Sequence, residues 1–179
     1  GDLRLNLASD QLYYDKMVQW APRASRNWWP QNYYSVYTSS TTKSLERNWT
    51  KFNANMKLTH QFSRVLATMS NDPAIVGKSL IYRPVLQAVY TSEFKLARGT
   101  LQLRGFYTGL RHTLRDNSPV GEISAQYWCA LAYTLSGANN RWNLLLQVDN
   151  VFNNERQYYQ LSSEIPVTVI SGLSVLLTR

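Results

Sequence analysis

The sequence predicts an all-β protein of about eight long antiparallel strands in meander order, and three observations lead to this prediction. Apolar and polar side chains alternate over runs longer than the roughly 5 to 6 residues common in soluble strands. Short and long connections alternate along the chain. Charged residues make up only 17% of the 179 residues and aromatic residues reach 13%, which excludes a disordered chain. This length corresponds to about one domain.

Composition excludes several other classes of protein. The one cysteine, Cys129, cannot form an internal disulfide, and two histidines with one cysteine cannot supply a four-ligand zinc site. No run approaches the roughly 18 apolar residues of a membrane-spanning helix. The formal net charge is +8, but the basic residues are spread along the chain, which argues against a nucleic-acid interface.

In the amino-terminal half, the first predicted strand starts at Leu3 and is extended by the segment from Tyr13 to Trp20. A run rich in Tyr, Thr and Ser, from Tyr33 to about Phe52, forms the second strand. Two more strands follow, and the apolar positions of the first, third and fourth strands are Leu3, Leu5 and Leu7; Met56, Leu58 and Phe62; and Leu86, Ala88 and Tyr90. The intervening positions are mainly polar, so each segment has two distinct faces.

Four further strands complete the series. Their apolar positions are Leu101, Leu103 and Tyr107; Ile123, Ala125, Tyr127, Cys129, Leu131, Tyr133 and Leu135; Trp142, Leu144, Leu146 and Val148; and Leu173, Val175 and Leu177. The opposite face is mixed or polar, and it includes Gln102, Arg104, Gln126 and Gln147.

The connections indicate how these strands are used. Short polar turns are expected at Asn53 to Asn55, Leu96 to Gly99 and Ser136 to Asn140. Long links are expected at Pro22 to Asn32, Ser70 to Ile81, Arg115 to Gly121 and Asn153 to Glu164. Outer-membrane barrels alternate short periplasmic turns with long extracellular loops. We therefore predict an antiparallel transmembrane β-barrel segment.

Lipid gives the two faces a physical meaning. A sheet can span a membrane only when its backbone amides are paired, with an apolar face toward lipid and a polar face toward a wet lumen. We expect Cys129 to face lipid, and Gln102, Arg104, Gln126 and Gln147 to line the lumen. A soluble barrel reverses the faces, and periodicity alone does not distinguish the two. Strand length, loop asymmetry and aromatic content favour the membrane barrel.

Three motifs, which occur along the chain in the same order as in one protein family, resemble the motifs of that family. They are described from the carboxyl end. The run Val148-Asp149-Asn150-Val151-Phe152-Asn153-Asn154, followed by Tyr158-Tyr159, resembles a strand end near the carboxyl terminus of TonB-dependent outer-membrane receptors. The run Gly77-Lys78-Ser79-Leu80-Ile81-Tyr82-Arg83-Pro84 is similar to the start of one of their strands. The run Val18-Gln19-Trp20-Ala21-Pro22, followed by Asn32, resembles one of their strand–loop–strand segments.

This resemblance implies a protein of the bacterial cell outer membrane that takes up a scarce ligand. The ligand is most often a ferric siderophore and sometimes cobalamin, haem or an oligosaccharide. Such receptors have a 22-stranded barrel and a plug, and nothing in the chain resembles the plug. Residues 1–179 are expected to be the C-terminal portion of that barrel, with the plug domain absent and the first and last strands left as unpaired edges. The implied partners are the TonB–ExbB–ExbD complex, through the missing plug, and outer-membrane lipid and lipopolysaccharide. We expect no cofactor and no nucleic-acid partner.

Two loops carry candidate ligand-binding residues. Arg23 and Arg26 beside Trp28 and Trp29 can hold an aromatic, anionic ligand through charge and stacking. The last loop offers a smaller group, namely Arg156, Tyr158 and Tyr159. The alternative for both groups is an interfacial aromatic belt, with the arginines contacting lipopolysaccharide or solvent.

No pattern supports catalysis or a resident metal. His112, Asp116 and Ser118 lie too close along one strand end and loop to be expected as a hydrolase triad, and no Gly-x-Ser-x-Gly occurs. His60 and His112 lack the carboxylates or cysteines that accompany metal ligands. Two other hypotheses stay open. One is a self-contained eight-stranded outer-membrane barrel with a structural, adhesive or lipid-modifying role, and the other is a soluble ligand-binding barrel of lipocalin type.

Overall fold

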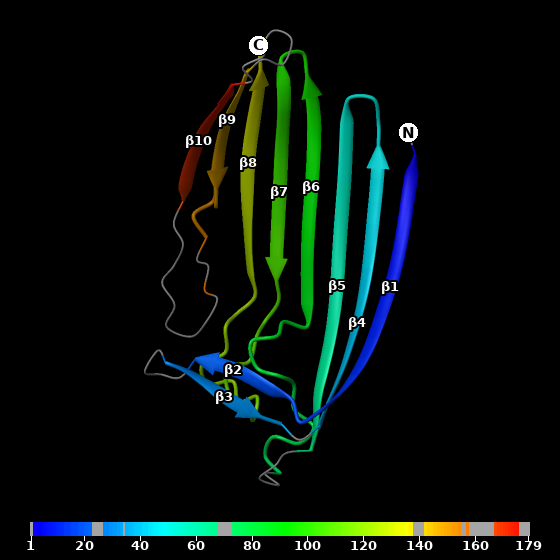
Figure 1. Ribbon diagram of the computed structural model, residues 1–179, viewed down its shortest axis with the longest axis vertical. Coiled ribbons are helices and arrows are strands. Elements are labelled where there is room, and N and C mark those ends of the chain that lie inside the picture. Colours follow the sequence, from blue (N-terminus) through cyan, green and yellow to red (C-terminus); the bar gives the residue numbers. More distant parts are fainter. Residues whose placement is uncertain are drawn as a thin grey trace.

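The computed structural model describes residues 2–22, 27–33, 35–67, 73–137, 142–154, 157 and 167–175. These residues form ten strands in two antiparallel sheets (Figure 1). The strands are β1 (Leu3–Asp15), β2 (Val18–Pro22), β3 (Trp28–Asn32), β4 (Ser35–Asn48), β5 (Phe52–Ala67), β6 (Leu86–Leu96), β7 (Gly99–Thr108), β8 (Gln126–Ser136), β9 (Trp142–Asp149) and β10 (Thr168–Val175). The described part of the chain holds no helix long and apolar enough to span a membrane.

The larger sheet is an eight-stranded meander. Its order is β1-β4-β5-β6-β7-β8-β9-β10, and every neighbouring pair is antiparallel. Strands β1 and β10 lie at opposite edges of this sheet (Figure 1). The predicted all-β, antiparallel meander is confirmed. A self-contained eight-stranded barrel would require β1 to pair with β10, and the described strands do not make that pairing.

One face of the large sheet, which we call the apolar face, collects the alternating hydrophobic residues. The register aligns Leu5 with Leu45, Leu45 with Met56 and Met56 with Tyr90. The large hydrophobic side chains exposed on this face are Leu3, Leu5, Leu7, Tyr13, Leu45, Met56, Phe62, Tyr90, Phe94, Leu96, Tyr107, Tyr127, Leu131, Trp142, Leu146, Val169 and Leu173. Ser9, Thr41 and His60 interrupt this face. An apolar surface of this extent nevertheless indicates contact with another apolar phase or partner.

The opposite face, which we call the polar face, is the one over which the chain folds back. The backbone N–H of Leu80 donates to the hydroxyl oxygen of the buried Ser63 at 3.0 Å. The small hydrophobic core lies beside this contact and consists of Tyr33, Val36, Val65 and Leu80. A lipocalin-type barrel would instead enclose the apolar face. The register places Gln102, Arg104, Gln126 and Gln147 together on the polar face and Cys129 on the apolar face, as predicted.

Aromatic residues mark both ends of the apolar face. Tyr107 lies directly opposite Tyr127 toward the long links. Phe52 stacks on Trp49 and on Phe94 beside the turn between β4 and β5, with ring centroids 5.0 Å and 4.5 Å apart. Two aromatic borders around an apolar band are typical of outer-membrane strands. We call the two ends of the sheet the loop-side end and the short-turn end.

The amino-terminal segment differs from the prediction in two respects. The first strand does not continue to Trp20, because β1 ends at Asp15 and Lys16 adopts a φ of 55°. The stretch predicted as a long link from Pro22 to Asn32 instead takes part in the hairpin of β2 and β3, in which Trp20 faces Pro30. The change of direction at Lys16 lets the hairpin leave the large sheet.

Three further strand limits were predicted wrongly. Asn53 and Asn55 lie inside β5, and the turn is formed by residues 49–51, where the N–H of Trp49 donates to the carbonyl of Phe52. Strand β8 starts at Gln126, because Ile123 pairs with Arg111 in an isolated bridge. The last strand starts earlier than predicted, at Thr168, and Leu177 lies outside the described residues.

Candidate functional site

Three segments far apart in the sequence meet at the loop-side end. They are the β2–β3 hairpin, the link after β5 and the link between β7 and β8 (Figure 1). The side-chain amide of Gln19 donates to the carbonyl of Ile81 at 2.9 Å. The guanidinium of Arg115 donates to the carbonyl of Asn32 at 3.4 Å. The hairpin is therefore tied to both links.

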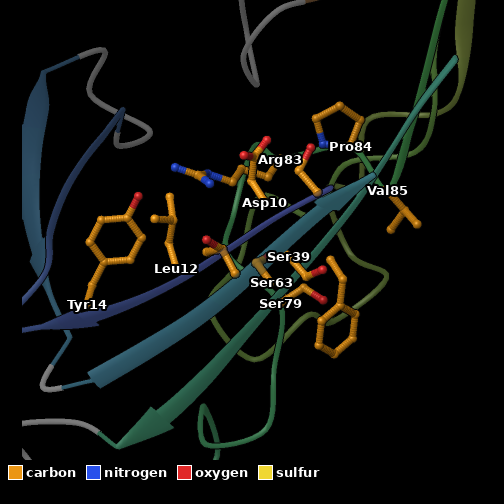
Figure 2. Close-up of a pocket in the computed structure, with 12 residues that line it drawn as sticks. Asp10, Leu12, Tyr14, Ser39, Ser63, Ser79, Arg83, Pro84 and Val85 are labelled. Atoms are coloured by element: carbon orange, nitrogen blue, oxygen red, sulfur yellow. The ribbon is translucent and has the colours of Figure 1, made fainter. Parts of the chain in front are cut away.

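A pocket of about 270 Å³ lies between the large sheet and the segment from Ser79 to Val85 (Figure 2). Its lining residues are Asp10, Leu12, Tyr14, Thr38, Ser39, Ser40, Phe62, Ser63, Ser79, Arg83, Pro84 and Val85. Hydroxyl groups dominate the polar part of the lining, and Asp10 and Arg83 add one negative and one positive charge. No ion pair joins these two residues in the described chain. The pocket can therefore offer both hydrogen-bond donors and acceptors to a polar ligand.

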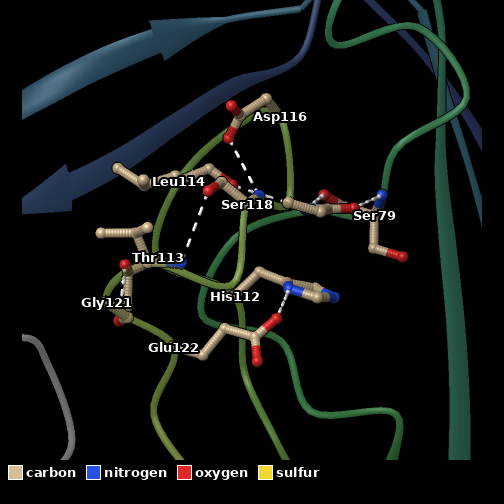
Figure 3. A network of polar contacts seen from close by, with 10 residues as sticks. Ser79, His112, Thr113, Leu114, Asp116, Ser118, Gly121 and Glu122 are labelled. Atoms are coloured by element: carbon tan, nitrogen blue, oxygen red, sulfur yellow. Dashed lines mark hydrogen bonds and ion pairs between the residues drawn. The ribbon is translucent and has the colours of Figure 1, made fainter.

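The segment that covers the pocket is held by Asn117. Its Oδ1 accepts from the N–H of Ser79 at 2.7 Å, and its Nδ2 donates to the carbonyl of Ser79 at 3.0 Å. Figure 3 shows these bonds between Ser79 and the turn that carries Asp116 and Ser118. Asn117 adopts a left-handed φ of 55°, a conformation that asparagine tolerates better than most residues. The Asn117 side chain thereby joins the two links through the backbone of Ser79.

The residues considered for a hydrolase triad have other partners. His112 Nδ1 lies 2.9 Å from a carboxylate oxygen of Glu122 (Figure 3). The carboxylate of Asp116 accepts from the N–H of Ser118 at 3.0 Å, and the Ser118 hydroxyl accepts from the N–H of Val120 at 3.4 Å. Asp116 and Ser118 thus stabilise their own turn. Within the described ranges, no group of three or more His, Cys, Asp and Glu side chains is placed to hold a metal ion.

Tyr33 is the largest fully buried side chain of the loop-side end. It is 1% exposed, and the Arg115 guanidinium lies 5.1 Å from its ring centroid. Burial raises the pKa of the Tyr33 phenol, while the charge of Arg115 and its hydrogen bond act in the opposite direction. Tyr33 therefore stays protonated and packs beneath a cation.

The predicted ligand-binding residues are only partly described. Trp28 and Trp29 lie in β3, opposite Pro22 and Ala21, and each is 49% exposed. The hairpin that carries them belongs to the smaller sheet and not to the apolar face of the larger one. The other predicted residues, Arg23, Arg26, Arg156, Tyr158 and Tyr159, lie outside the described residues.

Sequence reasoning did not select the pocket residues Asp10, Tyr14 and Arg83. A signal for Arg83 exists, because it belongs to the motif that starts at Gly77 and directly precedes Pro84. Asp10 and Tyr14 carried no such signal. They are the polar-face positions of one long strand, and only the fold-back of the Ser79–Val85 segment turns that part of the face into a pocket.

The motif around Asn150 has a structural role. Asn150 is fully buried with a φ of 53°, its Oδ1 accepts from the N–H of Asn154, and its Nδ2 donates to the carbonyl of Asn154 at 2.9 Å. The N–H of Val151 donates to the carbonyl of Cys129 at 3.0 Å. This turn ends β9 and attaches the following loop to β8.

Comparisons with known proteins find similarity in the fold alone. No protein-family profile matches the sequence, and no curated protein matches it. The copper transporter OprC superposes with a TM-score of 0.70 at 10% identity, covering 97% of this chain and 28% of that one. BauA, the ferric preacinetobactin receptor from Acinetobacter baumannii, gives 0.69 at 14% identity, covering 96% and 27%. The FrpB iron transporter from Neisseria meningitidis gives 0.69 at 12% identity, covering 97% and 29%.

These proteins are TonB-dependent receptors or transporters. The predicted resemblance to the barrel of that family is therefore confirmed at the level of the fold. The chain spans between a quarter and a third of the length of each of these three proteins.

Proposed function

We propose that residues 1–179 are the C-terminal wall of a TonB-dependent receptor barrel in the bacterial outer membrane, with the plug domain supplied by another part of the parent protein. The arrangement of the large sheet supports this proposal. The sheet is open, one face carries most of its exposed large hydrophobic side chains, and the chain folds back over the other, polar face. That arrangement suits a barrel wall with lipid outside and a wet lumen inside.

The parent protein would act as a transporter and not as an enzyme. The ligand we infer is a ferric siderophore, and the iron is cargo. Support comes from the fold shared with the ferric preacinetobactin receptor BauA and the iron transporter FrpB. Energy would come from the TonB–ExbB–ExbD complex acting through the plug. Cobalamin, haem and oligosaccharides are the other ligands that the family resemblance allows.

The loop-side end is the proposed point of first contact with ligand. Trp28 and Trp29 are each about half exposed, and the pocket at the same end of the sheet offers hydroxyl groups with Asp10 and Arg83. We include Arg23, Arg26, Arg156, Tyr158 and Tyr159 in the proposed binding surface because guanidinium and aromatic groups suit an anionic aromatic chelate. Lipopolysaccharide would surround this end of the barrel.

An uptake assay in cells tests the proposal. The full-length gene is expressed in a receptor-deficient strain, and import of radioiron is measured with a catecholate and a hydroxamate chelator. We expect the protein in the outer-membrane fraction and import of at least one chelate that stops when tonB is deleted. A soluble protein, or import that does not depend on TonB, would overturn the proposal.

A matched pair of variants tests the binding surface. The W28A/W29A double variant should bind the imported chelate at least tenfold more weakly, because a hot-spot aromatic side chain contributes about 2 kcal/mol. The control is W142A, which removes a tryptophan of similar exposure from the apolar face of β9. Equal affinities for W28A/W29A and W142A would exclude the hairpin from the binding surface.

A further inference from the structure

The short-turn end carries an aromatic and basic cluster that the transport proposal does not use. Trp49, Phe52 and Phe94 form a continuous stack beside the turn from β4 to β5. The Arg47 guanidinium lies 4.6 Å from the centroid of the Trp49 ring. Aromatic rings at this level are typical of a membrane–water boundary.

Arg47 stands at the margin of the apolar face. Its partners in the neighbouring strands are Leu3 and Ala54, and the next row on this face, toward the middle of the sheet, contains Leu45 and Met56. A guanidinium in this position can rest its stem on apolar surface while its charge reaches the headgroup layer. Trp49 holds that charge in a defined position.

A shallow hollow of about 470 Å³ adjoins the cluster. It is lined by Asp2, Asn48, Trp49, Thr50 and Lys51. Within the described chain neither Arg47 nor Lys51 forms an ion pair, so both cations are available to an external anion.

Two carboxylates lie near the hollow and bear on its charge. Glu46 accepts a hydrogen bond from the side-chain amide of Asn48 at 3.0 Å on the polar side of the strand. Asp2 lines the hollow itself, and its backbone carbonyl accepts from the N–H of Asn48 at 3.2 Å. Removal of the Asp2 charge should therefore favour an anion in the hollow.

We propose that this end of the sheet binds an anionic phospholipid of the membrane leaflet that faces the short turns. The lipid phosphate would lie between Arg47 and Lys51, its headgroup hydroxyls would meet Thr50, and its acyl chains would follow Leu45 and Met56. Charge complementarity and continuity with the apolar face select a lipid over a soluble anion. This inference rests on the membrane placement proposed above.

Native mass spectrometry of the full-length receptor, released from nanodiscs, tests the inference. The probes are phosphatidylglycerol and phosphatidylcholine at equal mole fraction, with soluble sn-glycerol 1-phosphate as a separate arm. We expect retained phosphatidylglycerol in excess over phosphatidylcholine and no retention of glycerol phosphate. Because a basic residue near an anionic lipid surface contributes about 1 kcal/mol, R47Q and K51Q should each reduce phosphatidylglycerol retention about fivefold.

Two variants sharpen the test. D2N should increase phosphatidylglycerol retention. K43Q removes the same charge from a residue of the apolar face opposite Leu7, nearer the loop-side end, and should leave retention unchanged. Heat-modifiable migration on gels verifies that each variant is folded.

Equal retention of the two lipids, equal effects of K43Q and R47Q, or binding of glycerol phosphate as tight as that of lipid would each overturn the inference. Failure of the transport proposal would be visible separately, as absence of the receptor from the outer-membrane fraction.

Discussion

Asn117 binds both backbone groups of Ser79, although the two residues are 38 positions apart in the sequence. The side-chain amide thereby reproduces the pair of bonds that a neighbouring strand would make. Leu80, the next residue, donates to Ser63 and fills the core beside Tyr33. One asparagine thus connects the link between β7 and β8 to the segment that roofs the pocket.

Loss of the Asn117 side chain should release the pocket roof. In N117G the left-handed backbone remains allowed but both bonds to Ser79 are lost, and such bonds contribute about 1 kcal/mol each. Hydrogen exchange of the Ser79 and Leu80 amides in the full-length receptor should accelerate by at least tenfold. N117A adds backbone strain and should exchange faster still. Unchanged exchange in both variants would show that the roof is held by other contacts.

Asn150 should be as sensitive to replacement. N150A removes two hydrogen bonds between the fully buried Asn150 side chain and the half-buried backbone of Asn154, at a total cost of about 1–3 kcal/mol. The measurement is the urea midpoint of the receptor in detergent. N150G keeps the left-handed φ and isolates the lost bonds, so it should be destabilised less than N150A. A midpoint within error of the wild-type value for N150A would contradict the turn-ending role.

The pH response of Tyr33 follows from its surroundings. Burial raises its pKa above the ordinary 10.0, and Arg115 opposes that shift. The R115Q variant should therefore raise the pKa further. Absorbance at the phenolate band, taken as the difference between each protein and its Y33F counterpart, reports this titration. A lower pKa of Tyr33 in R115Q would contradict the contact between the Arg115 cation and the Tyr33 phenol.

The same shift has a consequence for stability. Because the folded protein holds the Tyr33 proton more tightly than the unfolded chain, the contribution of this residue is complete below pH 10 and is lost as the pH rises through the folded-state pKa. Y33F should lack this alkaline loss. If the stability of Y33F and of wild type fell in parallel at alkaline pH, Tyr33 would not be the source of the loss.

Gly99 marks a close approach between β7 and β8. A Cβ atom at this position would overlap the backbone carbonyl oxygen of Thr134. G99A should therefore destabilise the receptor by about 1–3 kcal/mol, as overpacking does elsewhere. G105A is the matched control in the same strand, because its Cβ would lie at an ordinary 3.8 Å from Tyr90. Similar urea midpoints for the two variants would contradict this packing.

The two-faced strands could be predicted from sequence because a one-residue slip would move every side chain to the wrong face. Leu5, Leu45, Met56 and Tyr90 therefore share a face in the structure, as their alternation indicates. The positions of the turns were harder to predict from the sequence. Asn53 is a common turn residue, but here it is a polar-face position of a strand whose turn is formed at Trp49.

The hairpin and the pocket could not be predicted because they depend on contacts between distant segments. Pro22 and Pro30 argue against strands, yet β2 and β3 pair with each other and are anchored through Gln19 on Ile81. The link from Gly77 to Pro84 has no periodicity to show that Leu80 is buried. Its place becomes evident only once Asn117 and Ser63 are brought to it.

Spin-label accessibility along β9 distinguishes a barrel wall in lipid from a sheet in water. Single cysteines are placed at positions 143–148 of the full-length receptor in lipid bilayers, in a background where Cys129 is replaced by alanine. In a barrel wall we expect high oxygen accessibility at Leu144, Leu146 and Val148, and low oxygen accessibility at Asn143, Leu145 and Gln147. An absent or reversed alternation would contradict a barrel wall whose apolar face meets lipid.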